Sequence, residues 1–229
     1  MTVADDAWAG AVSAARLGRG IRVRPGAGRR PPERPLELWE FEACPFCRKV
    51  REGLSELDLS YVCHPCARGS AHRDEVPSPG GRKSFPYLRD PNTGAEMAES
   101  EDILDYLHAT YGPRRRWRER WLAPLNTLGS AVASALRPRG GVARRGRPPE
   151  ERLVLYQYEG CPFCRKVRER LHELDLVHLV QNVARGSARR PALEELGGKV
   201  QVPFLVDPNT GTSMYESDAI VAYLDATYG

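Results

Sequence analysis

The residues with the clearest chemistry are four cysteines that lie in two copies of one octapeptide. Residues 44–51 read CPFCRKVR, and residues 161–168 repeat the same eight letters. A short run of strand-forming residues precedes each copy, at 36–41 and 153–158, and apolar residues at helical spacing follow it. Each octapeptide is therefore predicted to lie where a strand turns directly into a helix.

A cysteine directly before a helix is well placed to act as a nucleophile. Proline suits the first helical position because it has no N–H to leave unpaired there. Cys44 and Cys161 are then expected to face the free N–H groups and the positive end of the helix dipole, which favours the reactive thiolate. Cys47 and Cys164 follow one turn later, within reach of a mixed disulfide formed at the first sulfur. We predict two dithiol redox centres with these four catalytic cysteines.

The two motifs belong to a duplication that covers most of the chain. Residues 36–112 align with 153–229 without a gap, and roughly 40 of the aligned pairs are identical. A repeat of this length is a whole domain. We therefore predict a leader (1–35), a first domain (36–112), a basic, partly helical linker (113–152, with a helix over 121–136) and a second domain (153–229).

Each repeat has the same predicted order of elements. After the first strand and helix come a second strand, a short variable helix, a third strand entered through proline, a hairpin turn spelled DPNTG, a fourth strand and a last helix. Alternating strands and helices favour an α/β sheet with the first two strands parallel. The predicted ranges are 60–62 and 177–180, 72–76 and 191–196, 85–88 and 202–206, and 102–110 and 218–227.

Composition and charge place few further limits on function. The chain has 229 residues, 41% hydrophobic and 28% charged, with a net charge of +4. No stretch approaches the roughly 18 apolar residues of a membrane span, and Asp5 and Asp6 argue against a signal peptide. The basic runs at 114–116 and 144–147 lack interleaved aromatic residues. We expect a cytoplasmic protein with no membrane and no nucleic-acid partner.

Taken together, the elements and motifs resemble the thioredoxin-fold family. The CPFC motif is similar to the active site of dithiol glutaredoxins, and residues 202–224, from VPFLVD through ESDAIVAYL, are similar to the N-terminal domain of glutathione transferases. The resemblance covers about two-thirds of the chain and excludes the leader and linker. It implies two tandem thioredoxin-like domains joined by the linker.

The resemblance also implies a thiol-binding site in each half. Pro86 and Pro203 would be cis-prolines beside the nucleophile, and the residue before each would offer backbone groups to the cysteinyl part of glutathione. Glu-Ser before the last helix would hold its γ-glutamyl end, although such a serine could instead be an ordinary helix cap. The implied glutathione-binding residues are Phe85, Pro86, Glu99, Ser100, Val202, Pro203, Glu216 and Ser217.

A second cysteine pair, Cys63 and Cys66, occurs only in the first half, where the second half has valines. Its spacing from Cys44 and Cys47 falls within the range of zinc ribbons. Parallel first and second strands would bring the four sulfurs to one edge of the sheet. We favour an auxiliary redox pair that exchanges with Cys44, with zinc binding or inert buried thiols as alternatives. The second CPFC has no such partner, so we predict no metal.

The remaining polar residues carry weaker signals. The five histidines include no pair at ligand spacing, and His64 is predicted to lie in a loop. Arg48, Lys49, Arg165 and Lys166 either raise the potential near the thiolates or are simply solvated helix residues.

The leading prediction is a glutaredoxin-like thiol–disulfide oxidoreductase that reduces disulfides or glutathionylated substrates. Its cofactor would be glutathione or another low-molecular-weight thiol, and its partner a disulfide-containing protein or small molecule. The first alternative is a glutathione-conjugating or glutathione-binding protein of transferase type, supported by 202–203 and 216–217. The second alternative is a non-enzymatic protein that binds a thiol or zinc.

Overall fold

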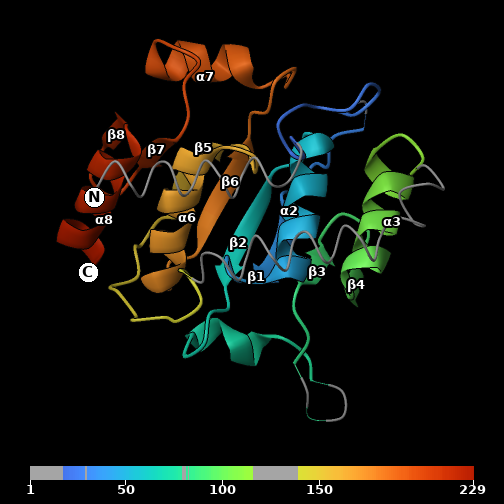
Figure 1. Cartoon of the computed structure of the whole chain (residues 1–229), viewed down its shortest axis with the longest axis horizontal. Coiled ribbons are helices and arrows are strands. Elements are labelled where there is room, and N and C mark those ends of the chain that lie inside the picture. Colours follow the sequence, from blue (N-terminus) through green and yellow to red (C-terminus); the bar gives the residue numbers. More distant parts are fainter. Residues whose placement is uncertain (1–17, 29, 79–80, 82, 116–138) are drawn as a thin grey trace.

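A computed structural model describes residues 18–28, 30–78, 81, 83–115 and 139–229. The helix predicted over 121–136 and the first part of the predicted leader lie outside the described residues. Within them, strands and helices alternate through each half in the predicted order (Figure 1). The first half contains β1 Leu36–Glu40, α2 Pro45–Glu56, β2 Tyr61–Pro65, the 3₁₀ helix η1 Ala71–Glu75, β3 Tyr87–Asp90, β4 Ala95–Ala98 and α3 Ser100–Tyr111.

The second half repeats this arrangement with one substitution of element type. A true helix, α7, replaces the short η1 of the first half. The elements are β5 Leu153–Gln157, α6 Pro162–Glu173, β6 His178–Asn182, α7 Arg190–Gly197, β7 Phe204–Asp207, β8 Thr212–Tyr215 and α8 Ser217–Tyr228.

Both halves have the strand order of a thioredoxin-like sheet. β1 pairs in parallel with β2 and antiparallel with β3, and β3 pairs antiparallel with β4. β5, β6, β7 and β8 repeat this pattern. The prediction of tandem thioredoxin-like units with parallel first strands is confirmed. His64 lies in β2, so its predicted place in a loop is wrong.

The two halves share one continuous sheet of eight strands. β2 of the first half pairs antiparallel with β6 of the second, with Val62 opposite Leu179 at the middle of the register. Each strand lies at the outer edge of its own half, so the pairing removes two exposed edges at once. The sequence pattern did not predict this pairing.

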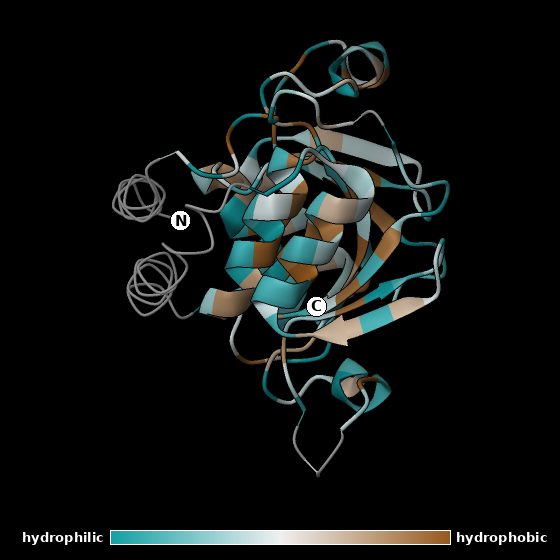
Figure 2. Cartoon of the chain, turned by 90° about the vertical axis from the view of Figure 1, so that its right-hand side faces the viewer, coloured by the Kyte–Doolittle hydropathy of each residue, from teal (hydrophilic) through white to brown (hydrophobic). Residues whose placement is uncertain are grey.

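Four of the helices pack on one side of this sheet, while Leu193 of α7 packs against Phe204 and Tyr156 on the other side. α2 and α3 cover the first half, and α6 and α8 cover the second (Figure 1). Figure 2 shows helices lying along one side of the strands in a turned view. Each half has its own apolar core between helices and strands, because Val50 and Leu54 of α2 meet the strands as Val167 and Leu171 of α6 do, and Leu57, directly after α2, joins the first core. The helical spacing of these apolar residues is the feature that the sequence displayed.

The described parts of the predicted leader and linker pair with the opposite half. Val23 N–H donates to the carbonyl of Arg185 and Arg185 N–H to the carbonyl of Ile21, both at 2.9 Å. In the same way, residues 141–143 exchange two hydrogen bonds of 2.9 Å with Arg68. Each segment therefore ties its own half to the other.

The DPNTG turn is held by its aspartate. Asp90 accepts hydrogen bonds from the hydroxyls of Tyr106, at 2.6 Å, and Tyr111, and from the N–H of Asn92 at 2.8 Å. Asp207 makes the corresponding bonds in the second half. This carboxylate connects the turn to the last helix in both halves.

Candidate functional site

Each leading cysteine caps the helix that follows it. Cys44 precedes α2 in an extended conformation, and its sulfur accepts the N–H of Cys47 at 3.3 Å. Cys161 makes the same contact with the N–H of Cys164, also at 3.3 Å, at the start of α6. Proline occupies the first helical turn in both copies. The strand, the capping sulfur and the helix therefore have the arrangement that the octapeptides predicted.

The two sulfurs of each motif have different environments. Cys44 and Cys161 are 4% and 3% exposed, whereas Cys47 and Cys164 are 0% exposed. The hydrogen bond from Cys47 lowers the pKa of Cys44, helped by the backbone N–H groups of the helix start and opposed by burial. Cys164 lowers the pKa of Cys161 in the same way. Burial raises the pKa of both second cysteines well above the ordinary value.

A cis-proline precedes the third strand of each half. The Phe85–Pro86 and Val202–Pro203 peptide bonds are both cis. The carbonyl oxygen of Phe85 lies 4.0 Å from the sulfur of Cys44. The phenylalanine inside each CPFC motif is about half exposed, Phe46 at 45% and Phe163 at 46%. In the first half, the Cys44 sulfur therefore lies against a carbonyl of the cis-proline loop, and in both motifs the phenylalanine two residues after the first cysteine faces solvent.

The Glu-Ser pairs lie at the start of the last helices. Glu99 is the N-cap of α3 with a positive φ of 66°, and Ser100 is the first helical residue. Glu216 and Ser217 have the same places in α8, with φ of 69° at Glu216. The side chains of these two N-cap glutamates make no capping hydrogen bond. The alternative role of serine as the cap is therefore wrong, and the helices begin earlier than predicted.

The basic residues after CPFC are not solvated helix residues. Lys49 pairs with Glu101, and Lys166 with Asp218, while all four basic side chains predicted here are only about 3% exposed. Arg165 lies 3.2 Å from Glu42 of the other half. These residues join helices and halves together instead of facing solvent.

A buried network of charged side chains connects the two sites, and we did not predict it from the sequence. Arg51 of α2 contacts Glu40, Glu42 at 3.1 Å and, in the second half, Glu159 at 3.0 Å. Arg168 of α6 contacts Glu42 and Glu159, each at 3.0 Å. The signal was present in both repeats, because a glutamate stands two residues before each first cysteine and an arginine ends each octapeptide.

This network also affects the ionisation of its members. Burial opposes the ionised form of Glu40, but Arg51 and His172 outweigh it and lower the pKa to about 2. Burial raises the pKa of Glu159 to about 7, despite its two arginine neighbours. The positive charge of Arg51 contributes to the lowered pKa of Cys44, and Arg168 acts likewise on Cys161. Both arginines therefore support the thiolate form while holding the halves together.

The second cysteine pair does not join the CPFC site. Cys63 belongs to the core beneath the helices, whereas Cys66 packs with Trp39 and Tyr87 on the other side of the sheet. Burial raises the pKa of both thiols, that of Cys66 above the usual range. Among the described residues, no three of the four first-half sulfurs form a ligand cluster. The geometry gives no support to the zinc alternative at these cysteines or to a relay through Cys63.

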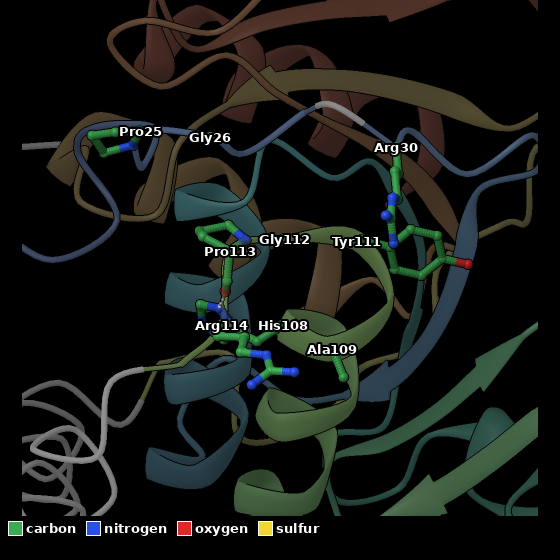
Figure 3. Close-up of a pocket in the computed structure, with 9 residues that line it drawn as sticks. All are labelled: Pro25, Gly26, Arg30, His108, Ala109, Tyr111, Gly112, Pro113 and Arg114. Atoms are coloured by element: carbon green, nitrogen blue, oxygen red, sulfur yellow. Dashed lines mark hydrogen bonds between the residues drawn. The ribbon is translucent and has the colours of Figure 1, made fainter.

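A separate cavity of about 820 Å³ lies at the far end of the same helices (Figure 3). His108, Tyr111 and Pro113 line it together with Arg30 and Arg114. It adjoins the C-terminal end of α3, close to the end of α2, which is about 18 Å of helix away from Cys44. This cavity is therefore distinct from the thiol sites.

Fold and sulfur geometry together define a tandem thioredoxin-fold protein with two equivalent cysteine-capped helices. A family model for the glutathione S-transferase N-terminal domain matches residues 38–115 and, a second time, residues 155–229. These matches cover more than half of the chain, which therefore belongs to the glutathione S-transferase N-terminal domain family.

The matches to individual proteins cover less of the chain or have low sequence identity. The chain is 32% identical over 80 residues to the glutathione S-transferase-like protein tpcF of Aspergillus fumigatus, a match that spans 35% of this chain and 36% of tpcF. A solved Leishmania structure, TDR1, described as a unique trimeric glutathione transferase, aligns over 86% of this chain and 67% of its own with 17% identity and a TM-score of 0.29.

Within the described residues, no helix is long and apolar enough to cross a bilayer.

Proposed function

We propose that the protein is a glutaredoxin-like thiol–disulfide oxidoreductase that works in the reducing cytoplasm at two CPFC sites. The observation that carries this proposal is the difference in position and in thiol pKa between the two cysteines of each motif. The first sulfur caps a helix and has a lowered pKa, while the second is fully buried and has a raised pKa. A nucleophile and a protonated resolving thiol require this difference.

In the proposed reaction, the Cys44 thiolate attacks one sulfur of a substrate disulfide. A mixed disulfide forms at Cys44, and the other substrate sulfur leaves as a thiolate that takes up a proton. Cys47 then loses its proton and attacks the sulfur of Cys44, which releases the second substrate thiol and leaves a Cys44–Cys47 disulfide. Two molecules of a low-molecular-weight thiol reduce this disulfide and are themselves oxidised to their disulfide. Cys161 and Cys164 act in the same way.

Glutathione fits the residues around each sulfur. The cis-proline loop brings the Phe85 carbonyl close to Cys44, where backbone groups can meet a cysteinyl unit. The N-cap residue of α3, Glu99, makes no side-chain capping hydrogen bond, so the N–H groups of this helix start suit a carboxylate. We assign Phe85, Pro86, Glu99 and Ser100 to glutathione or a related thiol in the first half, and Val202, Pro203, Glu216 and Ser217 in the second.

Glutathione conjugation is the second candidate function, and membership of the transferase N-terminal domain family favours it. An activated thiol of glutathione would attack an electrophile instead of a disulfide. This reaction does not need a second cysteine. Conjugation of a chlorinated aromatic acceptor that persists in the Cys47→Ser/Cys164→Ser variant would support the transferase reading.

Turnover of a glutathione mixed disulfide, with glutathione as reductant, tests the proposal. Cys44→Ser and Cys161→Ser should each lower turnover, and the double variant should abolish it. Cys47→Ser/Cys164→Ser should still reduce glutathionylated substrates while losing activity on protein disulfides, because only the latter need a resolving thiol. Turnover at the wild-type level in the Cys44→Ser/Cys161→Ser variant would contradict the proposal.

A further inference from the structure

Two histidines and a glutamate meet on the first half, away from both CPFC motifs. His64 comes from β2, and His72 and Glu75 come from η1. Nδ1 of His72 lies 2.7 Å from Oε1 of Glu75, and Nδ1 of His64 lies 3.5 Å from Oε2. One ligand atom from each residue lies within 4.8 Å of the other two. The histidines lie eight positions apart in two consecutive elements, so the chain spacing did not reveal them.

The second hydrogen bond of His72 determines which of its ring nitrogens can carry a proton, and therefore what can lie between His72 and Glu75. Its Nε2 lies 3.3 Å from the carbonyl oxygen of Asp175, which belongs to the second half. A carbonyl can only accept, so the ring proton belongs on Nε2 and the lone pair of Nδ1 points at Glu75. Two acceptors 2.7 Å apart need a positive species between them, either a proton or a metal cation. A metal-bound histidine usually donates its other N–H to such a carbonyl.

The glutamate and the second histidine are held in place in a comparable way. The indole N–H of Trp39 donates to Oε2 of Glu75 at 2.9 Å. The Trp39 ring also stacks on His64, with centroids 4.1 Å apart and an angle of 9° between the planes. Both ring nitrogens of His64 are buried and make no hydrogen bond within the part of the chain that the structure describes. A single tryptophan therefore orients two of the three side chains.

We propose that His64, His72 and Glu75 bind a divalent transition-metal cation, with Zn²⁺ the best match. Imidazole and carboxylate groups are its ordinary ligands, and bonds of about 2.05 Å separate neighbouring ligand atoms by roughly 3.3 Å. The 3.5 Å between His64 and Glu75 is already close to this value, and the 2.7 Å between His72 and Glu75 would lengthen when a metal replaces the proton. The Glu75 side chain is 45% exposed, so water can reach the fourth position of the metal.

The rest of the molecule offers two contrasts with this site. The second half has Gln181, Arg189 and Ala192 at the equivalent positions and lacks the ligand set. A second cluster, Glu40, Cys63 and His172, is fully buried at the junction of the halves. Its carboxylate already pairs with Arg51, and a buried divalent cation beside that guanidinium would be repelled. The proposal therefore concerns the η1 site alone.

Titration of the full chain with Co²⁺, at a pH where imidazole is neutral, tests the proposal. Co²⁺ takes the same ligands as Zn²⁺ and has visible absorption, and a thiolate ligand would add a charge-transfer band in the near ultraviolet. We expect one equivalent to bind without that band and Zn²⁺ to displace it. Glu75→Gln should weaken binding at least tenfold, and Trp39→Phe about tenfold through the lost second-sphere hydrogen bond. Glu195→Gln, a surface acid of α7, is the matched control and should change nothing.

Circular dichroism of each variant separates lost binding from lost folding. His72→Gln serves as a second ligand variant that leaves the Trp39–Glu75 hydrogen bond in place. The proposal is overturned if Co²⁺ does not bind, because the positive species beside His72 is then a proton. It is equally overturned if binding shows a thiolate band and survives Glu75→Gln, which would assign the metal to cysteines.

Discussion

The two halves of the molecule are nearly equivalent at their thiols and differ where they meet. Both have a sulfur that caps a helix, a cis-proline opposite and an aspartate that holds the DPNTG turn. The junction is asymmetric, because Glu40 corresponds to Gln157, Ser55 to His172 and Cys63 to Val180. The duplicated residues form both the thiol sites and the arginine–glutamate pairs of the junction, and the diverged residues lie around those pairs.

The largest expected effect concerns the two buried arginines. Arg51 faces three carboxylates, whereas Arg168 faces two, with the neutral Gln157 in place of the third. Removing one partner of a buried ion pair leaves uncompensated charge and costs about 3–5 kcal/mol. Arg51→Met should therefore lower the free energy of unfolding in urea by this amount, and Arg168→Met by less. Equal losses would show that the asymmetry of the junction has no energetic weight.

Acid should weaken the same junction. The pKa of Glu40 is lowered from 4.5 to about 2, so its contribution to stability is present above pH 4.5 and lost as the pH falls toward 2. The full loss is on the order of 3 kcal/mol. The contribution of Glu159 to stability changes with pH in the opposite direction. Because burial raises its pKa from 4.5 to about 7, Glu159 increasingly destabilises the folded state as the pH rises from 4.5 toward 7.

Unfolding in urea across this pH range measures the effect of Glu40. The variant Glu40→Gln carries the side chain that the second half has at the equivalent position, and should show a shallower acid dependence than the wild type. If this variant has the same dependence of unfolding free energy on pH as the wild type, Glu40 does not contribute to the acid sensitivity of the junction.

The aspartates of the DPNTG turns should behave alike, in contrast to the arginines. Asp90 and Asp207 are both 0% exposed and accept the same set of hydrogen bonds. Hydrogen bonds to a charged group contribute about 1.5–3 kcal/mol. Asp90→Asn and Asp207→Asn should each lower the unfolding free energy by about this much, within error of each other. A large difference would mean that the halves do not share this device.

The smallest expected effect is at Cys63. Its equivalent is Val180, both side chains are buried, and burial raises the pKa of the Cys63 thiol. Cys63→Val should cost less than about 1.5 kcal/mol and leave disulfide turnover unchanged. Reduced turnover in a well-folded variant would restore an auxiliary redox role to Cys63.

The sequence contained the local parts of this structure but not their assembly. CPFC and the apolar spacing of Val50, Leu54 and Leu57 were enough to predict the strand–cysteine–helix unit, because both depend on neighbouring residues. The pairing of β2 with β6 depends on which edge each half leaves free, which no short pattern records. The contacts of Arg51 were not predicted, because one of its glutamates, Glu159, comes from the other half of the chain.

The site residues divide in the same way. The cis bonds before Pro86 and Pro203 agree with the family resemblance. The approach of His72 to His64 depends on the path of the loop after β2, which the sequence does not encode in its spacing. Local chemistry was therefore predictable, and contacts made by tertiary folding were not.

The most direct test of the central claim is the pH profile of iodoacetamide alkylation at each cysteine of the native protein, followed by peptide mass spectrometry. We predict that Cys44 and Cys161 react first, with midpoints below the value of about 8.5 of free cysteine, while Cys47 and Cys164 stay unmodified. Midpoints at or above that of free cysteine, or equal reaction of all four sulfurs, would contradict it.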